Sequence, residues 1–237
     1  MSELADKLTD EVQEIVKSAW DYRDGEVVPD VADLALGNEA VKLEATMLYA
    51  DLADSTELAI RNREQAAEVF KAYLRGVTRL IRSCSGDVRS FDGDRVMGVF
   101  ISGNKNTNAA RCGLQINWFF NKVLITKFKE FYSSLEDFPF EQTVGIDNGT
   151  LTVIRSGIRN NNDLVWVGRA PNIAAKLSGI RGCGYPTLIT ESVYKSMLDD
   201  SKLGGLPKTN MWVQLNWSAG KGYGVGTLYG SNWLWTP

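Results

Sequence analysis

The chain has 237 residues, of which 44% are hydrophobic and 23% are charged, and its net charge is −3 at neutral pH. This composition is typical of a globular protein with a sizeable core, and the charge gives no electrostatic indication of a nucleic-acid partner or an anionic membrane. The sequence contains no histidine, which removes the commonest general base and the usual hydrolase triads. Carboxylates, hydroxyls, cations and a hard metal would have to carry any catalysis.

The sequence also lacks the segments that direct a protein into or across a membrane. No apolar stretch approaches the length of a membrane span, and the first residues lack the basic and apolar regions of a signal peptide. We therefore expect a cytoplasmic protein. The three cysteines, Cys84, Cys112 and Cys183, are too scattered for a disulfide framework or a zinc site, so buried thiols are expected.

The first expected element is an amphipathic helix, with apolar residues at helical spacing from Leu8 to Trp20. Packing on its own domain is the favoured interpretation, and pairing with a second copy is the alternative. A polar connection follows over residues 21–37. We expect residues 1–43 to form an N-terminal helix and linker, and residues 44–237 to form the main domain.

A strand over Thr46–Asp51 ends at an acidic residue, and a helix is expected over about Ser55–Ser83. Side chains alternate along a strand, so Tyr49 should face the same way as Asp51. The dipeptide Asp92-Gly93, between two apolar runs, predicts a β-hairpin with Asp94 on its turn.

The second half of the chain is predicted to alternate further strands and helices. Asn148-Gly149 predicts another hairpin between residues 141–147 and 150–154, after a helix over about 107–131. The remaining expected elements are a loop at 159–163, a strand at 164–168, a helix at 171–177, a short strand, a helix at 191–198 and a closing hairpin within 211–237.

Two carboxylates at adjacent strand ends, Asp51 and Asp94, suggest a site for hard cations such as Mg²⁺, which would bridge the phosphates of a nucleotide. The start of the neighbouring helix, with Ser55 and Thr56, offers backbone amides to an anion. Taken alone, each acidic stretch is equally explained by a helix cap or a turn. The two stretches together, followed later in the chain by Asn172 and Lys176 one helical turn apart, favour the site.

Four segments resemble the class III nucleotidyl cyclase catalytic domain in order and spacing, namely residues 48–56, 93–100, 144–149 and 167–177. The resemblance extends from about Ala45 over most of the chain. It implies an α+β, ferredoxin-like βαββαβ fold with an antiparallel sheet and helices on its outer face. It also implies a head-to-tail homodimer with active sites at the interface.

The resemblance further implies that Asp51, Leu52 and Asp94 hold two Mg²⁺ or Mn²⁺ ions, which activate the ribose 3′-hydroxyl for attack on the α-phosphate. Asn172 of the other protomer would orient the ribose. Lys176 stands where most of the family has arginine.

Two further cations resemble or could replace functional groups of the family. Arg169 could supply the missing guanidinium, or it could be a solvated cation at a helix start. Lys221 resembles the residue that holds the terminal phosphates, although a lysine in a glycine-rich turn is also common.

Neither purine-reading pattern of the family is present, because Ser90 and Val165 occupy its base-reading positions. The residues near the expected base pocket are Tyr49, Arg89, Ser90 and Asp92, and the bulk of Tyr49 could shorten the pocket toward a smaller ring. In these features the chain resembles the pyrimidine cyclases of the bacterial antiphage systems called Pycsar. Their product, cyclic CMP or cyclic UMP, activates a separate effector protein.

The base itself is left open between cytosine and uracil. CTP is slightly favoured over UTP because the carboxylate of Asp92 suits the exocyclic amine of cytosine. Strand alternation should turn Arg89 and Ser90 to opposite faces unless the hairpin is bulged. The alternatives are an ATP or GTP cyclase with an atypical pocket, and a cyclase-like module that binds a nucleotide without catalysis.

Overall fold

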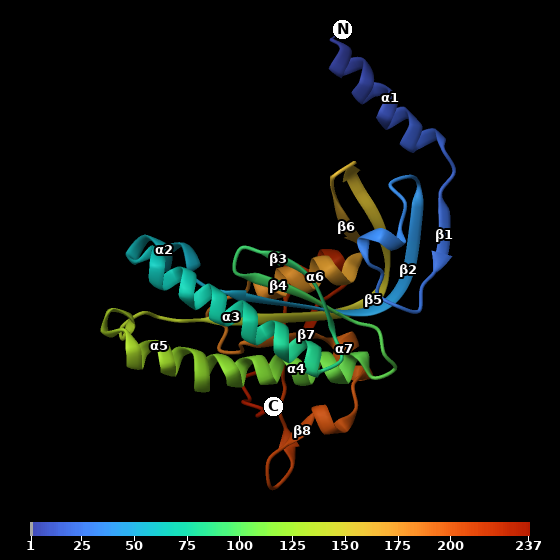
Figure 1. Cartoon of the computed structure of the whole chain (residues 1–237). Helices are drawn as coiled ribbons and strands as arrows, with labels where there is room; N and C mark the ends of the chain where they lie inside the picture. The colour runs from blue at the N-terminus through green and yellow to red at the C-terminus, as the bar shows by residue number, and fades with distance from the viewer. Residues whose placement is uncertain (1) are drawn as a thin grey trace. The chain divides into compact units, whose positions relative to one another are not determined.

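The computed structural model describes residues 2–237 (Figure 1), and these form two compact units. Unit 1 contains residues 2–44 and Thr150–Gly168, and the larger unit 2 contains Ala45–Gly149 and Arg169–Pro237. Strands β2 (Glu39–Leu52) and β5 (Gln142–Ile158) run through both units. The chain therefore passes between the units along strands.

Helix α1 (Glu3–Lys17) begins unit 1, and the side chain of its cap Ser2 accepts a hydrogen bond from the Ala5 amide at 3.3 Å. The apolar spacing predicted this helix correctly. None of its residues is buried, so the expectation that it packs on its own domain was wrong. Its apolar residues, including Val12 and Val16, stay exposed.

The remaining strands of unit 1 pair with the parts of β2 and β5 that lie in it. Strand β1 (Asp21–Asp24) pairs in parallel with the first residues of β2, where a polar connection was expected. A 3₁₀ turn at Val31–Asp33 follows β1. Strand β6 (Asn161–Val167) pairs antiparallel with the end of β5, so it begins earlier than the expected strand.

The hairpin predicted at Asn148-Gly149 is wrong, because both residues lie within the continuous strand β5. The side-chain amide of Asn148 donates to Asn106 Oδ1 at 2.9 Å, which holds it to a neighbouring element instead of leaving it for a turn. The chain turns later, between Ile158 and Asn161, where Asn160 adopts a left-handed conformation with φ of 69°. Asparagine tolerates that conformation better than most residues.

The sheet of unit 2 has the strand order expected for a ferredoxin-like fold. Strands β5, β2, β4 and β3 lie side by side in that order, and β7, β11 and β10 continue the sheet beyond β5. The additional strands are β3 (Asp87–Asp92), β4 (Arg95–Phe100), β7 (Thr187–Thr190), β10 (Val213–Asn216) and β11 (Thr227–Ser231), with a separate small pair, β8 (Leu203–Gly204) and β9 (Thr209–Asn210). The mixed α+β fold and the Asp92-Gly93 hairpin are therefore confirmed.

Two helices that were expected to be continuous are interrupted. Asn62 is extended, and its side chain accepts from the Gln65 amide at 3.0 Å, so it ends α2 (Ser55–Arg61) and caps α3 (Arg63–Ser83). The second helix widens into a π-helical turn at Phe120–Leu124, between α4 (Lys105–Phe119) and α5 (Ile125–Phe131). There the Asn121 side chain donates to the Asn117 carbonyl at 2.9 Å and competes with the helical hydrogen bonds.

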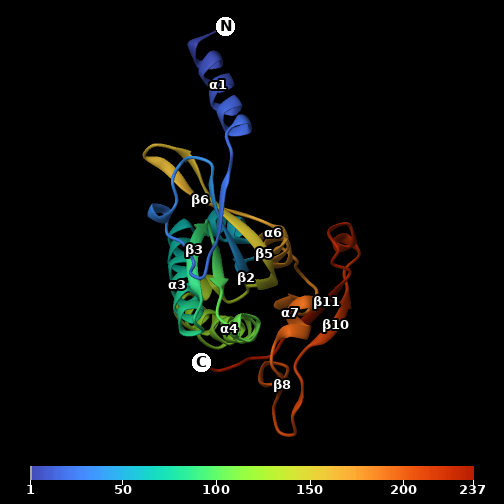
Figure 2. The same cartoon turned by 90° about the vertical axis from the view of Figure 1, so that its right-hand side faces the viewer.

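Helices α4 and α6 (Arg169–Ser178) cover opposite faces of β5, as the two views show (Figure 1 and Figure 2). A β-carbon on Gly113 of α4 would lie 3.4–3.5 Å from the side chains of Ile146 and Val144. A β-carbon on Gly145 would instead lie 2.2 Å from the Ala174 carbonyl oxygen of α6. Because successive residues of a strand point to opposite faces, Gly145 marks the face on which α6 lies almost against the backbone.

The main core of unit 2 lies between the strands and helices α3 and α4. Leu48 and Ala50 of β2 face this core together with Tyr73 and Val77 of α3. The short helix α7 (Glu191–Ser196) contributes Val193 to the same core. Among residues 2–237, no helix is long and apolar enough to cross a membrane.

We expect Gly145→Ala to destabilise the protein by about 1–3 kcal/mol, because its new methyl group would overlap the backbone of α6. Denaturant unfolding monitored by tryptophan fluorescence measures this change. Gly103→Ala is the matched control, since nothing lies within 4 Å of the position of its β-carbon. Equal stability of the two variants would contradict the close approach of α6 to β5.

Candidate active site

The two predicted metal carboxylates lie at neighbouring strand ends. Asp51 is near the end of β2 and pairs in register with Arg95, the first residue of β4, while Asp94 precedes Arg95 on the hairpin turn. The Oδ2 atom of Asp94 is buried and has no hydrogen-bond partner among residues 2–237. A buried, unsatisfied carboxylate oxygen fits a cation-binding role.

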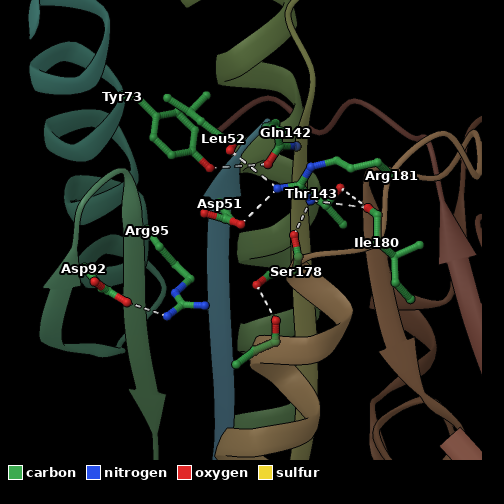
Figure 3. Close-up of polar contacts among 11 residues, drawn as sticks. Asp51, Leu52, Tyr73, Asp92, Arg95, Gln142, Thr143, Ser178, Ile180 and Arg181 are labelled. Carbon is green, nitrogen blue, oxygen red and sulfur yellow. Dashed lines mark hydrogen bonds and ion pairs between the residues drawn. The ribbon is translucent and has the colours of Figure 1, made fainter. Parts of the chain in front are cut away.

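An arginine that the sequence analysis did not single out contacts this site. The Arg181 guanidinium lies 2.9 Å from Asp51 Oδ2 and 3.4 Å from the carbonyl oxygen of Leu52 (Figure 3). Arg181 lies in the segment between α6 and β7. No local pattern marks it, because its role depends on the packing of α6 against the sheet.

The carboxylates influence one another and their surroundings. Burial raises the pKa of Asp51, the charge of Asp94 raises it further, and the contacts with Arg181 and the charge of Arg95 oppose the rise. Burial and the charges of Asp51 and Asp94 also raise the pKa of Tyr73 well above its usual range. The charges of both carboxylates therefore act on the buried hydroxyl group of Tyr73.

Oxygen ligands at this site suit Mg²⁺ or Mn²⁺. Among the residues that the structure describes, no three or more carboxylate, cysteine or histidine side chains gather into a metal-binding group. The site instead offers two carboxylates, Asp51 and Asp94, and Leu52 can add only its backbone carbonyl. The donors present are chemically suited to the ions, and the Oδ2 atom of Asp94 is free of hydrogen bonds to residues 2–237.

Tyr49 faces away from the main core, on the same face as Asp51, as alternation predicted. Its hydroxyl donates to Met97 Sδ at 2.8 Å, and the Arg95 guanidinium lies 5.4 Å from the centre of its ring. Burial raises the pKa of Tyr49, against the charge of Arg95. Tyr49 is thus a neutral, fixed side chain beside the carboxylates.

The hairpin carries the other residues expected at the base. Its register shifts between Val88 and Ser90, so Arg89 is the extra residue of a β-bulge, which removes the strict alternation between Arg89 and Ser90. Asp92 forms an ion pair with Arg95 at 2.6 Å (Figure 3). The Asp92 side chain is 76% exposed, so this ion pair lies at the surface of the hairpin.

Val165, the fifth residue expected at the base, lies on β6 in unit 1, opposite Ile154 of β5. Its side chain is exposed. A role for Val165 in base recognition stays a prediction.

Helix α6 carries the predicted catalytic residues. Arg169, in its first turn, forms an ion pair with the fully buried Asp147 at 3.3 Å and donates to the Asn148 carbonyl at 3.1 Å. Arg169 is thus not simply a solvated cation. Asn172 lies one turn later on the same helix, with Lys176 one turn beyond it.

Lys176 and Lys221 belong to neighbouring elements. The Lys176 ammonium lies 5.1 Å from the ring centre of Tyr223, a cation–π distance. Lys221 lies in the same 3₁₀ turn as Tyr223, at Ser218–Tyr223. This turn links β10 and β11 and places Lys221 in the closing hairpin, as expected.

Ser55 and Thr56 begin α2, which is only seven residues long, after Asp54 in a left-handed conformation with φ of 55°. The long helix expected to present an anion site at this point is thus absent. Phosphate binding by Ser55 and Thr56 stays a prediction.

The chain has close full-length relatives. No protein-family model matches it. It is 39% identical to a uridylate cyclase of Xanthomonas perforans over 98% of both chains, and 39% identical to one of Burkholderia cepacia over 98% of this chain and 99% of that protein. The chain belongs to the uridylate cyclase family. It is thus a nucleotidyl cyclase, and the non-catalytic alternative is set aside.

Solved structures of adenylyl and guanylyl cyclases share the fold of this chain. The adenylyl cyclase CyaB of P. aeruginosa superposes with a TM-score of 0.67 at 22% identity, over 81% of this chain and 95% of that chain. The guanylyl cyclase Cya2 superposes with a TM-score of 0.63 at 17% identity, over 83% and 95%. At these identities the likeness establishes the fold and does not identify the base.

We expect Asp147→Asn to change how stability depends on pH. Burial raises the pKa of Asp147, with a hydrogen bond from Thr190 and the charge of Arg169 opposing it. A folded-state pKa above the unfolded value of about 3.9 means that the wild type loses stability as Asp147 ionises. The wild type should therefore lose stability relative to Asp147→Asn as pH rises from about 4.

Denaturant unfolding of both proteins across this pH range measures the difference. Asp163→Asn is the control, since Asp163 is exposed and its variant should follow the wild type. A difference between wild type and Asp147→Asn that does not vary with pH would contradict the burial of an ionisable Asp147.

Proposed function

We propose that the protein is a uridylate cyclase that converts UTP to 3′,5′-cyclic UMP and pyrophosphate. The observation that carries the proposal is near full-length identity of 37–39% to three proteins named uridylate cyclase. The paired carboxylates Asp51 and Asp94 support it, because they suit the metal-assisted chemistry of the class. The carboxylate of Asp92 favoured CTP on chemical grounds, but it equally accepts from the N3–H of uracil.

The proposed metal site consists of Asp51, Asp94 and the Leu52 carbonyl. Two bound Mg²⁺ or Mn²⁺ ions would neutralise the triphosphate and make the ribose 3′-hydroxyl more acidic. Ser55, Thr56 and Lys221 would hold phosphate oxygens through amide, hydroxyl and ammonium donors. These donors would keep the α-phosphate in line with the 3′-oxygen.

The residues of α6 would complete the site from a second copy in a head-to-tail homodimer. Asn172 would orient the ribose, and the Lys176 ammonium would lie against the charge that develops on the phosphate. Lysine provides this charge without the planar fork of arginine. Arg169 is held by Asp147 and Asn148, so it would align the start of α6 instead of replacing that arginine.

The proposed base pocket is formed by Tyr49 and the bulged hairpin. Tyr49, fixed by Met97 and Arg95, would limit the depth of the pocket to a single ring. Asp92 would accept from uracil N3–H, and Arg89 or Ser90 would donate to a uracil carbonyl. The resemblance to Pycsar cyclases supports a role in antiphage signalling, with cyclic UMP acting on a separate effector protein.

We expect Asp51→Asn to lower the rate of cyclic UMP formation at least 1000-fold, because it removes a charged metal ligand (about 4 kcal/mol of barrier). Mass spectrometry of products after incubation with Mn²⁺ and each of UTP, CTP, GTP and ATP measures both rate and base preference. Asp200→Asn is the control, because Asp200 pairs with Arg111 elsewhere in unit 2.

Equal rates of cyclic UMP formation by the wild type and Asp200→Asn, with a rate at least 1000-fold lower for Asp51→Asn, are the expected result. Faster turnover of CTP than of UTP would show that the protein is a cytidylate cyclase and not a uridylate cyclase. Faster turnover of ATP or GTP would contradict a pyrimidine-specific pocket.

We expect Tyr49→Ala to lower kcat/KM for UTP about tenfold and to narrow the preference for UTP over ATP and GTP, because it opens the base pocket. Competition between nucleotides in one reaction measures the preference. Tyr22→Ala is the control, since Tyr22 lies on β1 in unit 1. An unchanged preference in Tyr49→Ala would show that other residues exclude purines.

A further inference from the structure

The Arg181 guanidinium joins two parts of unit 2 that carry different proposed functions. Its Nη2 atom donates to Asp51 Oδ2 at 2.9 Å and to the Leu52 carbonyl at 3.4 Å. Its Nη1 atom donates to the carbonyl oxygens of Ser178 and Ile180, the latter at 3.3 Å (Figure 3). One side chain thus links the end of β2 with the end of α6.

On the strand side, Arg181 engages the same oxygens that are proposed as metal ligands. Asp51 and the Leu52 carbonyl are oxygen donors suited to a hard cation, and Arg181 supplies a positive charge to both. Its side chain is 28% exposed, and that of Asp51 is 19% exposed, so solvent screens the pair only partly. A divalent ion that binds these oxygens meets a charge of its own sign.

On the helix side, the carbonyl groups that Arg181 engages are themselves fixed. The Ile180 carbonyl also accepts from Thr143 Oγ1 of β5 at 2.8 Å, and the Ser178 hydroxyl donates to the Ala175 carbonyl at 2.9 Å. The positive charge lies at the C-terminal end of α6, where the helix dipole favours it. The guanidinium therefore keeps a favourable position even without Asp51.

We propose that Arg181 is the internal cation of the metal site: it neutralises Asp51 in the metal-free protein, competes with the divalent ion, and remains bound to the end of α6 when the ion takes its place. This inference rests on the proposed metal site. It makes Arg181 a positioning residue that connects the metal ligands with the helix carrying Asn172 and Lys176. A planar guanidinium can serve both sets of oxygens at once, whereas an ammonium cannot.

The proposal predicts that removing the charge strengthens metal binding. Arg181→Met should bind Mn²⁺ at least tenfold more tightly than the wild type, because the ion no longer competes with a cation at Asp51. Without metal, Arg181→Met should unfold at a lower temperature, because Asp51 then loses its ion-pair partner and only Arg95 offsets its repulsion from Asp94. Added Mn²⁺ should raise its unfolding temperature more than that of the wild type.

The experiment is titration of the full chain with Mn²⁺ alone, following free Mn²⁺ by electron paramagnetic resonance, together with thermal unfolding. Arg181→Lys keeps the charge and should bind Mn²⁺ with an affinity nearer to the wild type than to Arg181→Met. Arg111→Met is the matched control, because it breaks another Arg–Asp ion pair of unit 2, at 2.8 Å, and should leave Mn²⁺ affinity unchanged. Asp51→Asn should weaken binding in every background.

The outcomes separate this proposal from the one on which it rests. Equal or weaker Mn²⁺ binding by Arg181→Met, with Asp51→Asn still weakening it, would keep the metal site and overturn the role of Arg181. A merely structural arginine gives this result, since its loss cannot strengthen binding. Equally tight Mn²⁺ binding by Arg181→Lys and Arg181→Met would show that the charge of residue 181 does not compete with the ion. Absence of Mn²⁺ binding in all proteins would overturn both proposals.

Discussion

Repulsion between two carboxylates is the constraint on which the site depends. Asp51 and Asp94 lie at neighbouring strand ends, and the charge of Asp94 raises the pKa of Asp51. Two arginines offset the repulsion. Arg95 lies opposite Asp51 in the pairing of β2 with β4, and Arg181, which follows α6, forms an ion pair with Asp51. Without a cation such a pair has no structural benefit, which supports the proposed metal site.

The features that sequence predicted correctly are those set by neighbouring residues. The hairpin at Asp92-Gly93 and the facing of Tyr49 with Asp51 each follow from local turn chemistry or strand alternation. The position of Asp51 beside Asp94 follows from two such local features together with pairing of β2 and β4. This is why the carboxylate pair could be predicted from the residues, whereas the ferredoxin-like order was implied by the resemblance to class III cyclases.

The features that sequence missed depend on distant partners. Asn148-Gly149 has the composition of a turn, yet contacts with Asn106 keep Asn148 in a strand. Asn62 interrupts a helix whose apolar spacing is continuous, because its side chain accepts a hydrogen bond from the Gln65 amide at the start of α3. Arg181 lies 130 residues from Asp51 along the chain, so neither spacing nor composition could associate them. Likewise, no sequence pattern could indicate that α1 buries none of its apolar residues.

The contact of α6 with the backbone of β5 at Gly145 also limits the conformational entropy of α6. A helix that lies directly on a strand, with no side chain between them, has little freedom to rotate or slide, and the ion pair of Arg169 with the buried Asp147 fixes its first turn. The backbone positions of Asn172 and Lys176 are therefore set before any nucleotide binds. In the proposed roles of Asn172 and Lys176, less conformational freedom would then be lost on reaching the transition state, and the absence of a β-carbon at Gly145 would favour the rate.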